Sequence, residues 1–242
     1  MIGPLLRDTP TLHVVVPVHN EEPELVDSIR TLTTFLGNHL ADLAWKVIIA
    51  ENASTDRTLP LAESIAASDP NVRVLHLPQR GRGRAVRRAW TEQPADVVAY
   101  MDLDLSTDLR HFPPLVHAVL NGHDVAIGTR NLPASIVRGR TLLRTLTSKG
   151  YIFLIRLMFP VHFSDAQCGF KAVTRQAAQM LLPGVEDDDW FFDTELLIRA
   201  EAAGLSIYEE PVTWTDNPGS TVRVWKTITG DLRGLWRLYR ER

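Results

Sequence analysis

The chain has 242 residues, 45% of them hydrophobic and 23% charged, so one globular domain can bury a sizeable core. This composition excludes a disordered protein, a collagen and a coiled coil. Lysine and arginine together number 26 against 29 aspartates and glutamates, and the formal net charge of -3 argues against a nucleic-acid binder that relies on bulk positive charge.

Short β-branched runs alternate with amphipathic helical patterns through the first half of the chain. The predicted strands are residues 12–18, 45–50, 72–77, 97–101 and 125–128. The predicted helices between them are residues 22–36, a helix that ends near residue 67, residues 83–91 and residues 112–120. Strands separated by helices pair in parallel, and apolar strand runs indicate helices on both faces. The pattern therefore predicts an α/β fold with a doubly wound, mostly parallel sheet.

The alternation changes after residue 128. A basic stretch precedes an apolar helix at residues 151–159, and a mixed α and β tail follows. The longest apolar run, residues 151–161, contains Arg156 and Pro160 and is too short for a membrane-spanning helix. The single cysteine, Cys168, favours a reducing compartment, and the N-terminus lacks the apolar core of a secretion signal. We therefore expect a cytoplasmic protein that does not cross a membrane but can lie on one.

Two carboxylates, Asp102 and Asp104, follow directly after the predicted strand 97–101. Ligands of doubly wound sheets bind beyond the carboxyl ends of the strands. Two carboxylates at such a strand end can share a hard divalent cation with the oxygens of a diphosphate, whereas the alternative is a solvated turn. The eight histidines are scattered, so a zinc site is not expected.

A glycine-rich segment with several arginines follows the strand 72–77. Gly81 and Gly83 allow close approach of a ligand to the backbone, but Val86 stands where a dinucleotide fingerprint has its third glycine, and a Walker A ending is absent. The arginines form a cationic edge, and most of them are expected on a solvated helix face. They are Arg80, Arg82, Arg84, Arg87 and Arg88.

Seven short motifs occur in an order that chance seldom produces. They are PVHNE at 17–21, ENASTD at 51–56, RGRGRA at 80–85, DLD at 102–104, IGTR at 127–130, DAQCGFK at 165–171 and FDTEL at 192–196. With these motifs the sequence, from about residue 12 to residue 214, resembles the family 2 glycosyltransferases of GT-A fold. Within that family it is most similar to the dolichyl-phosphate and polyprenyl-phosphate sugar synthases.

The resemblance implies an inverting, metal-dependent glycosyltransferase domain over residues 1–216. Such a domain moves a hexose from a nucleotide diphosphate sugar, of the GDP-mannose or UDP-glucose type, to a polyprenyl phosphate. The donor-binding residues that it implies are Pro17, His19, Asn20, Glu21, Glu51, Asn52, Arg82, Asp102 and Asp104. A magnesium or manganese ion would be held by Asp102, Asp104 and Ser106.

The resemblance also implies catalytic roles for Asp104 and Asp165 and an acceptor-phosphate site at Arg130, Arg144 and Ser148. Arg144 and Ser148 are four residues apart and would share one face of a helix, where a guanidinium and a hydroxyl can both donate to a phosphate.

The chain departs from the family pattern at the segment 51–54, where Glu51 and Asn52 replace two aspartates and Ala53 replaces glycine. Ser106 stands where glutamine is frequent. The replacements by Glu51 and Asn52 leave the base of the donor open.

The aspartate of the FDTEL motif has a structural interpretation. Asp193 is well placed to cap a helix at residues 195–203, and we favour structural roles for both Asp193 and Glu195.

Residues 217–242 carry six cations and two anions, with apolar residues at near-helical spacing. This pattern predicts a basic amphipathic helix at an anionic membrane surface, which residues 151–159 could join. The alternative is a tail helix packed on the domain.

Two other functions are compatible with the sequence. One is a cytosolic family 2 glycosyltransferase with a soluble or protein acceptor. The other is a noncatalytic module that binds a nucleotide sugar or a nucleic acid through the arginine edge, which the intact pair Asp102 and Asp104 disfavours. We therefore expect a nucleotide sugar, a polyprenyl phosphate and a membrane surface as partners, and no nucleic acid.

Overall fold

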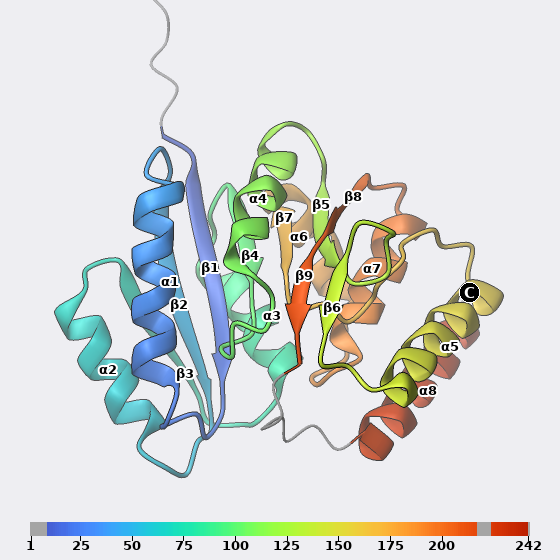
Figure 1. Cartoon of the computed structure of the whole chain (residues 1–242), viewed down its shortest axis with the longest axis horizontal. Coiled ribbons are helices and arrows are strands. Elements are labelled where there is room, and N and C mark those ends of the chain that lie inside the picture. The colour runs from blue at the N-terminus through green and yellow to red at the C-terminus, as the bar shows by residue number, and fades with distance from the viewer. Residues whose placement is uncertain (1–8, 217–223, 242) are drawn as a thin grey trace, which may run out of the picture.

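A seven-stranded sheet forms the centre of the computed structural model, in which residues 9–216 and 224–241 are described (Figure 1). Its strands are β1 (Thr11–Val18), β2 (Ala44–Asn52), β3 (Val72–Leu77), β4 (Val97–Tyr100), β5 (Val125–Thr129), β7 (Lys171–Thr174) and β8 (Ile207–Pro211). They lie in the order β3-β2-β1-β4-β7-β5-β8. All neighbours pair in parallel except β7, which runs antiparallel to both β4 and β5. The predicted mostly parallel sheet is confirmed.

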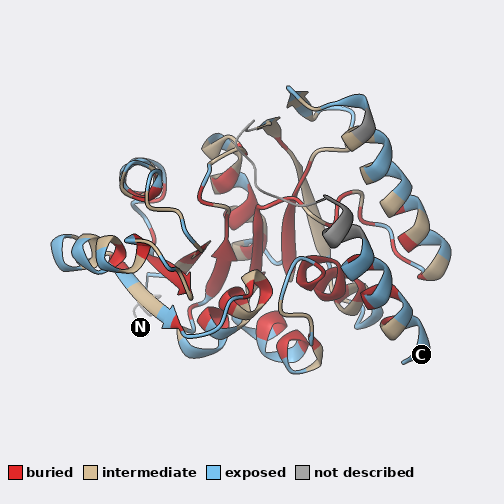
Figure 2. Ribbon diagram, turned by 90° about the horizontal axis from the view of Figure 1, so that it is seen from below, coloured by how far each residue is buried: buried red, intermediate tan, exposed pale blue. Residues whose placement is uncertain are grey.

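Helices cover both faces of this sheet (Figure 2). One face is covered by α1 (Leu25–His39), α2 (Thr58–Ser68) and α4 (Phe112–Leu120). The other is covered by α3 (Arg82–Glu92), α6 (Arg175–Leu181) and α7 (Phe192–Ala202), and α5 (Leu142–Met158) and α8 (Val224–Arg240) pack on that side. Short 3-10 turns lie at Leu109–His111 and Leu182–Gly184. A second, two-stranded parallel sheet joins β6 (Ile136–Arg138) and β9 (Thr213–Thr215).

The strand pleat explains why the strand sequences are apolar throughout. In β1, Val14 and Val16 enter the core beneath α1 and α4, whereas Val15 enters the core beneath α3. Both faces of the strand are therefore buried, as expected for a doubly wound sheet.

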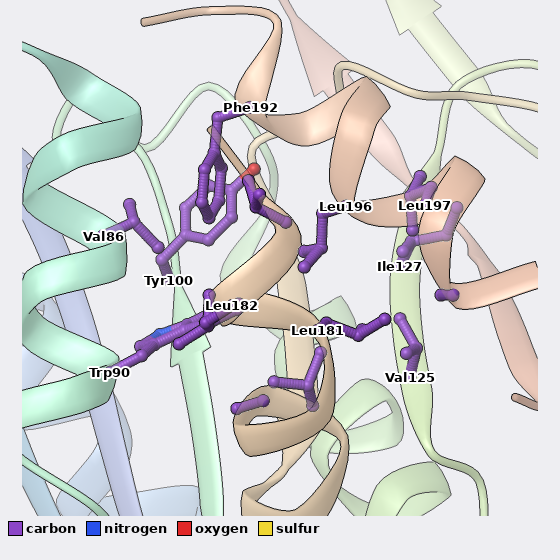
Figure 3. Close-up of a cluster of buried hydrophobic side chains, with 14 of the residues drawn as sticks. Val86, Trp90, Tyr100, Val125, Ile127, Leu181, Leu182, Phe192, Leu196 and Leu197 are labelled. Carbon is purple, nitrogen blue, oxygen red and sulfur yellow. The ribbon is translucent and has the colours of Figure 1, made fainter. Parts of the chain in front are cut away.

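The core between the sheet and α7 is rich in aromatic side chains (Figure 3). The Trp90 ring of α3 lies 6.0 Å from the Tyr100 ring of β4 and 6.3 Å from the Phe192 ring of α7. The Trp90 indole also donates to the carbonyl of Ala99 at 3.3 Å, so its one polar atom is satisfied. This packing fixes α7 against α3 and places Asp193 beside the sheet.

Two predicted helices begin earlier in the structure than the sequence suggests. The helix α5 begins at Leu142, where the Thr141 hydroxyl accepts from the backbone N–H of Arg144 at 3.3 Å. The helix α7 begins at Phe192, so the prediction that Asp193 caps a helix at 195–203 is wrong. Asp193 lies inside the first turn and binds buried cations, which compete more strongly for its carboxylate than the helix N–H groups do.

The helix α8 packs on the domain through one of its faces. Leu235 and Leu238 are buried, and Gly234 lies so close to the Phe191 ring that a Cβ atom there would clash. On the opposite face, Trp236 is 59% exposed. The tail is therefore a packed helix with an exposed apolar face. The predicted boundary at residue 217 lies outside the described residues, and so do two of the predicted cations, Arg223 and Arg242. In the described part of the chain, no helix combines the length and the apolarity needed to span a membrane.

A buried carboxylate in α8 makes the stability of the protein depend on pH. Asp231 accepts from the Gln167 amide at 2.9 Å, but its Oδ1 has no hydrogen-bond partner among the described residues. Burial raises the pKa of Asp231 to about 7. The folded-state pKa lies above the unfolded-state value of about 4, so the unfolded chain loses this proton first and stability falls between about pH 4 and pH 7.

We predict that Asp231→Asn flattens this pH dependence, because asparagine keeps an oxygen for Gln167 and cannot ionise. The gain in unfolding free energy should be small near pH 4 and reach a few kcal/mol above pH 7. Urea unfolding across this range measures it. Parallel pH profiles for the two proteins would contradict the assignment.

Candidate active site

The side chain of Asn52 joins three loops at the carboxyl edge of the sheet. Its amide donates to the Val18 carbonyl at 2.7 Å and accepts from the Gly81 N–H at 3.0 Å. The Asn52 carbonyl in turn lies 2.9 Å from Nδ1 of His19. Asn52 is buried, so this predicted donor-binding residue holds the loops in place and does not itself lie on the surface.

Two residues in these loops adopt left-handed backbone conformations, Asn20 with a φ of 57° and Ala53 with a φ of 59°. Asn20 accepts from the Thr55 N–H at 2.8 Å, and its own N–H donates to the Ser54 hydroxyl at 3.0 Å. Asparagine tolerates this conformation, whereas for alanine it costs about 1 kcal/mol of conformational free energy. The family's glycine at position 53 thus has a conformational reason, and this chain retains the turn without it.

Glu51, the residue expected to face the donor base, is completely covered. Its carboxylate accepts from the Ser54 N–H at 2.6 Å and lies 2.5 Å from Nδ1 of His76, its neighbour across the β2–β3 pair. The His76 side chain is 49% exposed and is the polar group that reaches the surface here. His76 belongs to none of the seven motifs, and only the strand register places it beside Glu51.

Asp102 and Asp104 lie after β4, as predicted, and each has a partner. Arg82 donates to Asp102 at 2.7 Å through Nη2 and to Asp193 at 2.7 Å through Nη1. Asp104 is exposed and accepts from the hydroxyl of Ser106 at 2.6 Å. Of the predicted metal ligands, Asp104 and Ser106 are therefore hydrogen-bonded to each other, and Asp102 is tied to the core by Arg82.

Asp193, for which we expected a structural role, is linked to Asp102 through Arg82. Its Oδ1 lies 3.1 Å from Nζ of Lys171, which also donates to the Cys168 carbonyl at 2.8 Å and is completely buried. Burial alone would raise the pKa of Asp193, but Lys171 and Arg82 outweigh it and the pKa is lowered. Glu195, in contrast, binds Arg199 and Arg237 at 2.9 and 2.7 Å, consistent with its predicted structural role.

The prediction that most arginines of the glycine-rich segment are solvated is wrong for three of them. Arg84 and Arg87 both bind the Asp188 carboxylate, and Arg82 is buried between Asp102 and Asp193. Asp188, in the loop before α7, thus pairs with two of the five arginines.

The residues at the end of β4 fit a divalent cation that is shared with a ligand. The described residues contain no group of three histidine, cysteine, aspartate or glutamate side chains able to hold a metal unaided. Magnesium typically uses one or two carboxylates together with substrate phosphates, which matches Asp102 and Asp104. Burial, together with the charges of Glu24, Asp104 and other nearby carboxylates, raises the pKa of Glu21 to about 7.

Two arginines of the predicted acceptor site, Arg130 and Arg144, each bind a carboxylate. Arg130 binds Asp165 through two parallel hydrogen bonds of 2.7 and 2.9 Å, and both side chains are almost completely buried. Burial alone would raise the pKa of Asp165, but Arg130 outweighs it and the pKa is lowered. Arg144 binds Asp216 at 2.6 and 2.8 Å, and the half-buried Ser148 follows one turn later in α5. The predicted catalytic Asp165 is therefore already paired with the predicted phosphate ligand Arg130.

The strand β9 connects the two groups of residues. The Thr215 N–H donates to the Ser106 carbonyl at 2.9 Å, and Thr107 and Trp214 form an antiparallel bridge. On the other side, the Arg130 guanidinium lies 5.6 Å from the centre of the Trp214 ring. Two ligands would therefore lie next to each other. One is a diphosphate whose cation is held by Asp102 and Asp104, and the other is an anion held by the arginines.

The fold and these motifs belong to one known family. Residues 13–182 match the family model described as Glycosyl transferase family 2, and the chain belongs to this family. Glycosyltransferase AglD from Haloferax volcanii is 38% identical over 93% of this chain, which spans only 37% of that relative. The dolichyl-phosphate beta-glucosyltransferase of Drosophila melanogaster is 31% identical over 98% of this chain and 78% of the relative.

The fold is also found in solved structures. The glucosyl-3-phosphoglycerate synthase of Mycobacterium tuberculosis, in a complex with Mn²⁺, UDP-glucose and phosphoglyceric acid, superposes with a TM-score of 0.69. The match covers 95% of this chain and 79% of that one, at 20% identity. The expected GT-A fold is confirmed.

Gly169 offers a test of residues 102–106, the predicted metal loop. It lies against the Asp102 carboxylate so closely that a Cβ atom would clash with Oδ2. We predict that Gly169→Ala displaces Asp102 and lowers sugar transfer by about 100-fold. Steady-state kinetics on the folded variant measure it.

The matched control is Gly150→Ala in α5, where a Cβ atom would meet nothing within 4 Å. It should leave transfer unchanged and raise the unfolding free energy by about 0.5–1 kcal/mol. Normal transfer by Gly169→Ala would show that the position of Asp102 is not critical.

Proposed function

We propose that this chain transfers a hexose from a nucleotide diphosphate sugar to the phosphate of a polyprenyl lipid, with inversion at the anomeric carbon. One observation carries the proposal: β9 joins the loop of Asp102 and Asp104 to the arginines around Trp214. A carboxylate pair suited to a cation on a diphosphate thus lies beside cations suited to a second phosphate. The name of the Drosophila relative supports a dolichyl-type acceptor.

The reaction depends more on stabilising negative charge than on transferring a proton. An oxygen of the acceptor phosphate forms a bond to the anomeric carbon while the bond from that carbon to the donor diphosphate breaks. The electron pair leaves with the nucleoside diphosphate. A phosphate is already anionic at neutral pH, so no strong base is needed, and a single displacement inverts the anomeric carbon. The protein mainly positions the two anions and balances their charge.

Each part of the site then has a role. Arg130 and Arg144 attract the acceptor phosphate, and Asp165 acts as a positioning residue that fixes the Arg130 guanidinium. Asp102 and Asp104, with Ser106 bound to Asp104, would hold a magnesium or manganese ion. Such an ion, when bound, stabilises the charge on the departing diphosphate.

The sugar and the base of the donor are separate questions. The relative from Drosophila is named for transfer of glucose, which supports a glucosyl donor. The M. tuberculosis structure contains UDP-glucose, which makes UDP-glucose the first donor to test and GDP-mannose the second.

Removing the Asp104 carboxylate tests the cation site. We predict that Asp104→Ala lowers transfer to polyprenyl phosphate by about 100-fold or more, because charge on the leaving group grows in the transition state. Binding of the nucleotide should weaken less. Initial rates with and without a chelator measure the effect.

The control is Asp42→Ala, which removes an exposed aspartate in the turn between α1 and β2, at the opposite edge of the sheet. It should behave as the wild type. Undiminished transfer by Asp104→Ala, or by the chelated wild type, would refute the cation site.

A membrane surface fits one end of the molecule, where α5 and α8 pack against each other (Figure 1). Four apolar residues of α5 are 68% to 83% exposed and share one helix face. They are Leu142, Leu146, Phe153 and Leu157. The helix has no acidic residue, and the single one in α8, Asp231, is buried. Exposed apolar side chains on two helices that contribute no exposed carboxylate suit an anionic bilayer, so we propose a peripheral protein on the cytoplasmic face of the membrane.

We predict that the pair Leu146→Gln and Phe153→Gln weakens binding to anionic vesicles by more than about tenfold, because it removes exposed apolar area without touching the core. Flotation with phosphatidylserine vesicles measures it. Met180→Gln, which changes an exposed apolar residue of α6, is the control. Equal flotation of the double variant and the wild type would reject this surface.

A further inference from the structure

Within the described residues, one cation beside the proposed acceptor site has no anionic partner. Three arginines approach this region, and two of them are paired, Arg130 with Asp165 and Arg144 with Asp216. Arg140 makes no hydrogen bond and no ion pair with any residue in 9–216 or 224–241. It is half-buried, and its guanidinium lies 5.9 Å from the centre of the Trp214 ring.

The surroundings of Arg140 are unfavourable for an unpaired charge. Burial lowers the pKa of Arg140, and the charges of Arg130 and Arg144 add to this effect, while Asp165 and Asp216 oppose it. The helix α5 begins just after Arg140, at the Thr141 cap, and its N-terminus adds further positive potential. A bound anion would relieve the repulsion between these positive groups.

The chemistry of the guanidinium selects the kind of anion. A guanidinium that lies over an indole ring can still direct its N–H groups to a ligand, and those groups match the oxygens of a phosphate. Trp214 contacts both Arg130 and Arg140 and pairs with Thr107, close to the metal loop. An anion held by Arg140 would therefore lie next to the donor diphosphate.

We propose that Arg140, whose guanidinium lies over the Trp214 ring, binds the phosphate of the acceptor directly. The proposal rests on the proposed function and extends it, because no sequence motif marks Arg140. The ligand class is a phosphate monoester of an isoprenoid alcohol. Arg130 and Arg144, held by their carboxylates, complete the positive pocket.

The test measures binding separately from catalysis. Calorimetry with a short-chain isoprenyl monophosphate should show an affinity about 10- to 100-fold lower for Arg140→Ala than for the wild type. Arg140→Lys should recover part of the lost affinity, because the lysine ammonium keeps the positive charge but lacks the paired N–H donors of the guanidinium. Affinity for the nucleotide diphosphate should not change. The isoprenyl alcohol, which lacks the phosphate, should bind independently of Arg140.

The matched control is Arg138→Ala. Arg138 lies two residues earlier, is exposed, and its backbone carbonyl accepts from the Asp216 N–H. Removing its side chain should leave isoprenyl phosphate binding unchanged. Equal losses in Arg138→Ala and Arg140→Ala would overturn the proposal, because they would indicate a diffuse effect of positive charge.

The outcomes separate the inference from the proposed function. Unchanged phosphate affinity in Arg140→Ala, while the wild type still transfers sugar to polyprenyl phosphate, would overturn the role of Arg140 and leave the function standing. Arg140-dependent phosphate binding by a wild type that transfers no sugar would support the site and refute the function. An equal loss of nucleotide affinity would overturn the inference, because it would place Arg140 at the donor.

Discussion

The ionic bridge of Arg82 fixes the metal loop to the core, and the rest of the site depends on it. Its guanidinium binds Asp102 on one side and Asp193 on the other, each at 2.7 Å. Arg82 and Asp193 are almost completely buried, and Lys171 supplies a second cation to Asp193. Removing one partner of such a network leaves an unpaired buried charge, which costs about 3–5 kcal/mol. The position of Asp102 is thereby linked to α3, α7 and β7 at once.

In the proposed acceptor site, too, a buried charge orients a charge of opposite sign, but the positions of cation and carboxylate are exchanged. There a buried carboxylate, Asp165, fixes the cation Arg130, whereas in the donor site a buried cation, Arg82, fixes the carboxylate Asp102. Each charge that we propose to face a substrate is thus oriented by a partner of opposite sign before a ligand binds. The strand β9 lies between the two pairs and keeps them adjacent. This preorganisation is what a reaction between two anions requires.

The elements best predicted from the sequence are those whose pattern is local. The helix α4 was predicted at the residues it occupies, 112–120, because its apolar period and its prolines mark both the face and the start. The antiparallel β7 could not be foreseen, since strand direction is set by connections and not by composition. Asp193 was assigned to a cap because its cationic partners, Arg82 and Lys171, are remote in sequence. The motif order located the site, but His76 and Arg140 stand outside every motif and became visible only through register and packing.

The most direct test of the account is the fate of labelled sugar from UDP-glucose and GDP-mannose in the presence of both polyprenyl phosphate and water-soluble acceptors. We predict that label from one donor enters the organic phase as a polyprenyl phosphate sugar, and that its anomeric configuration, measured by NMR, is opposite to that of the donor. Label found only in water-soluble products, or a lipid product with retained configuration, would contradict the account.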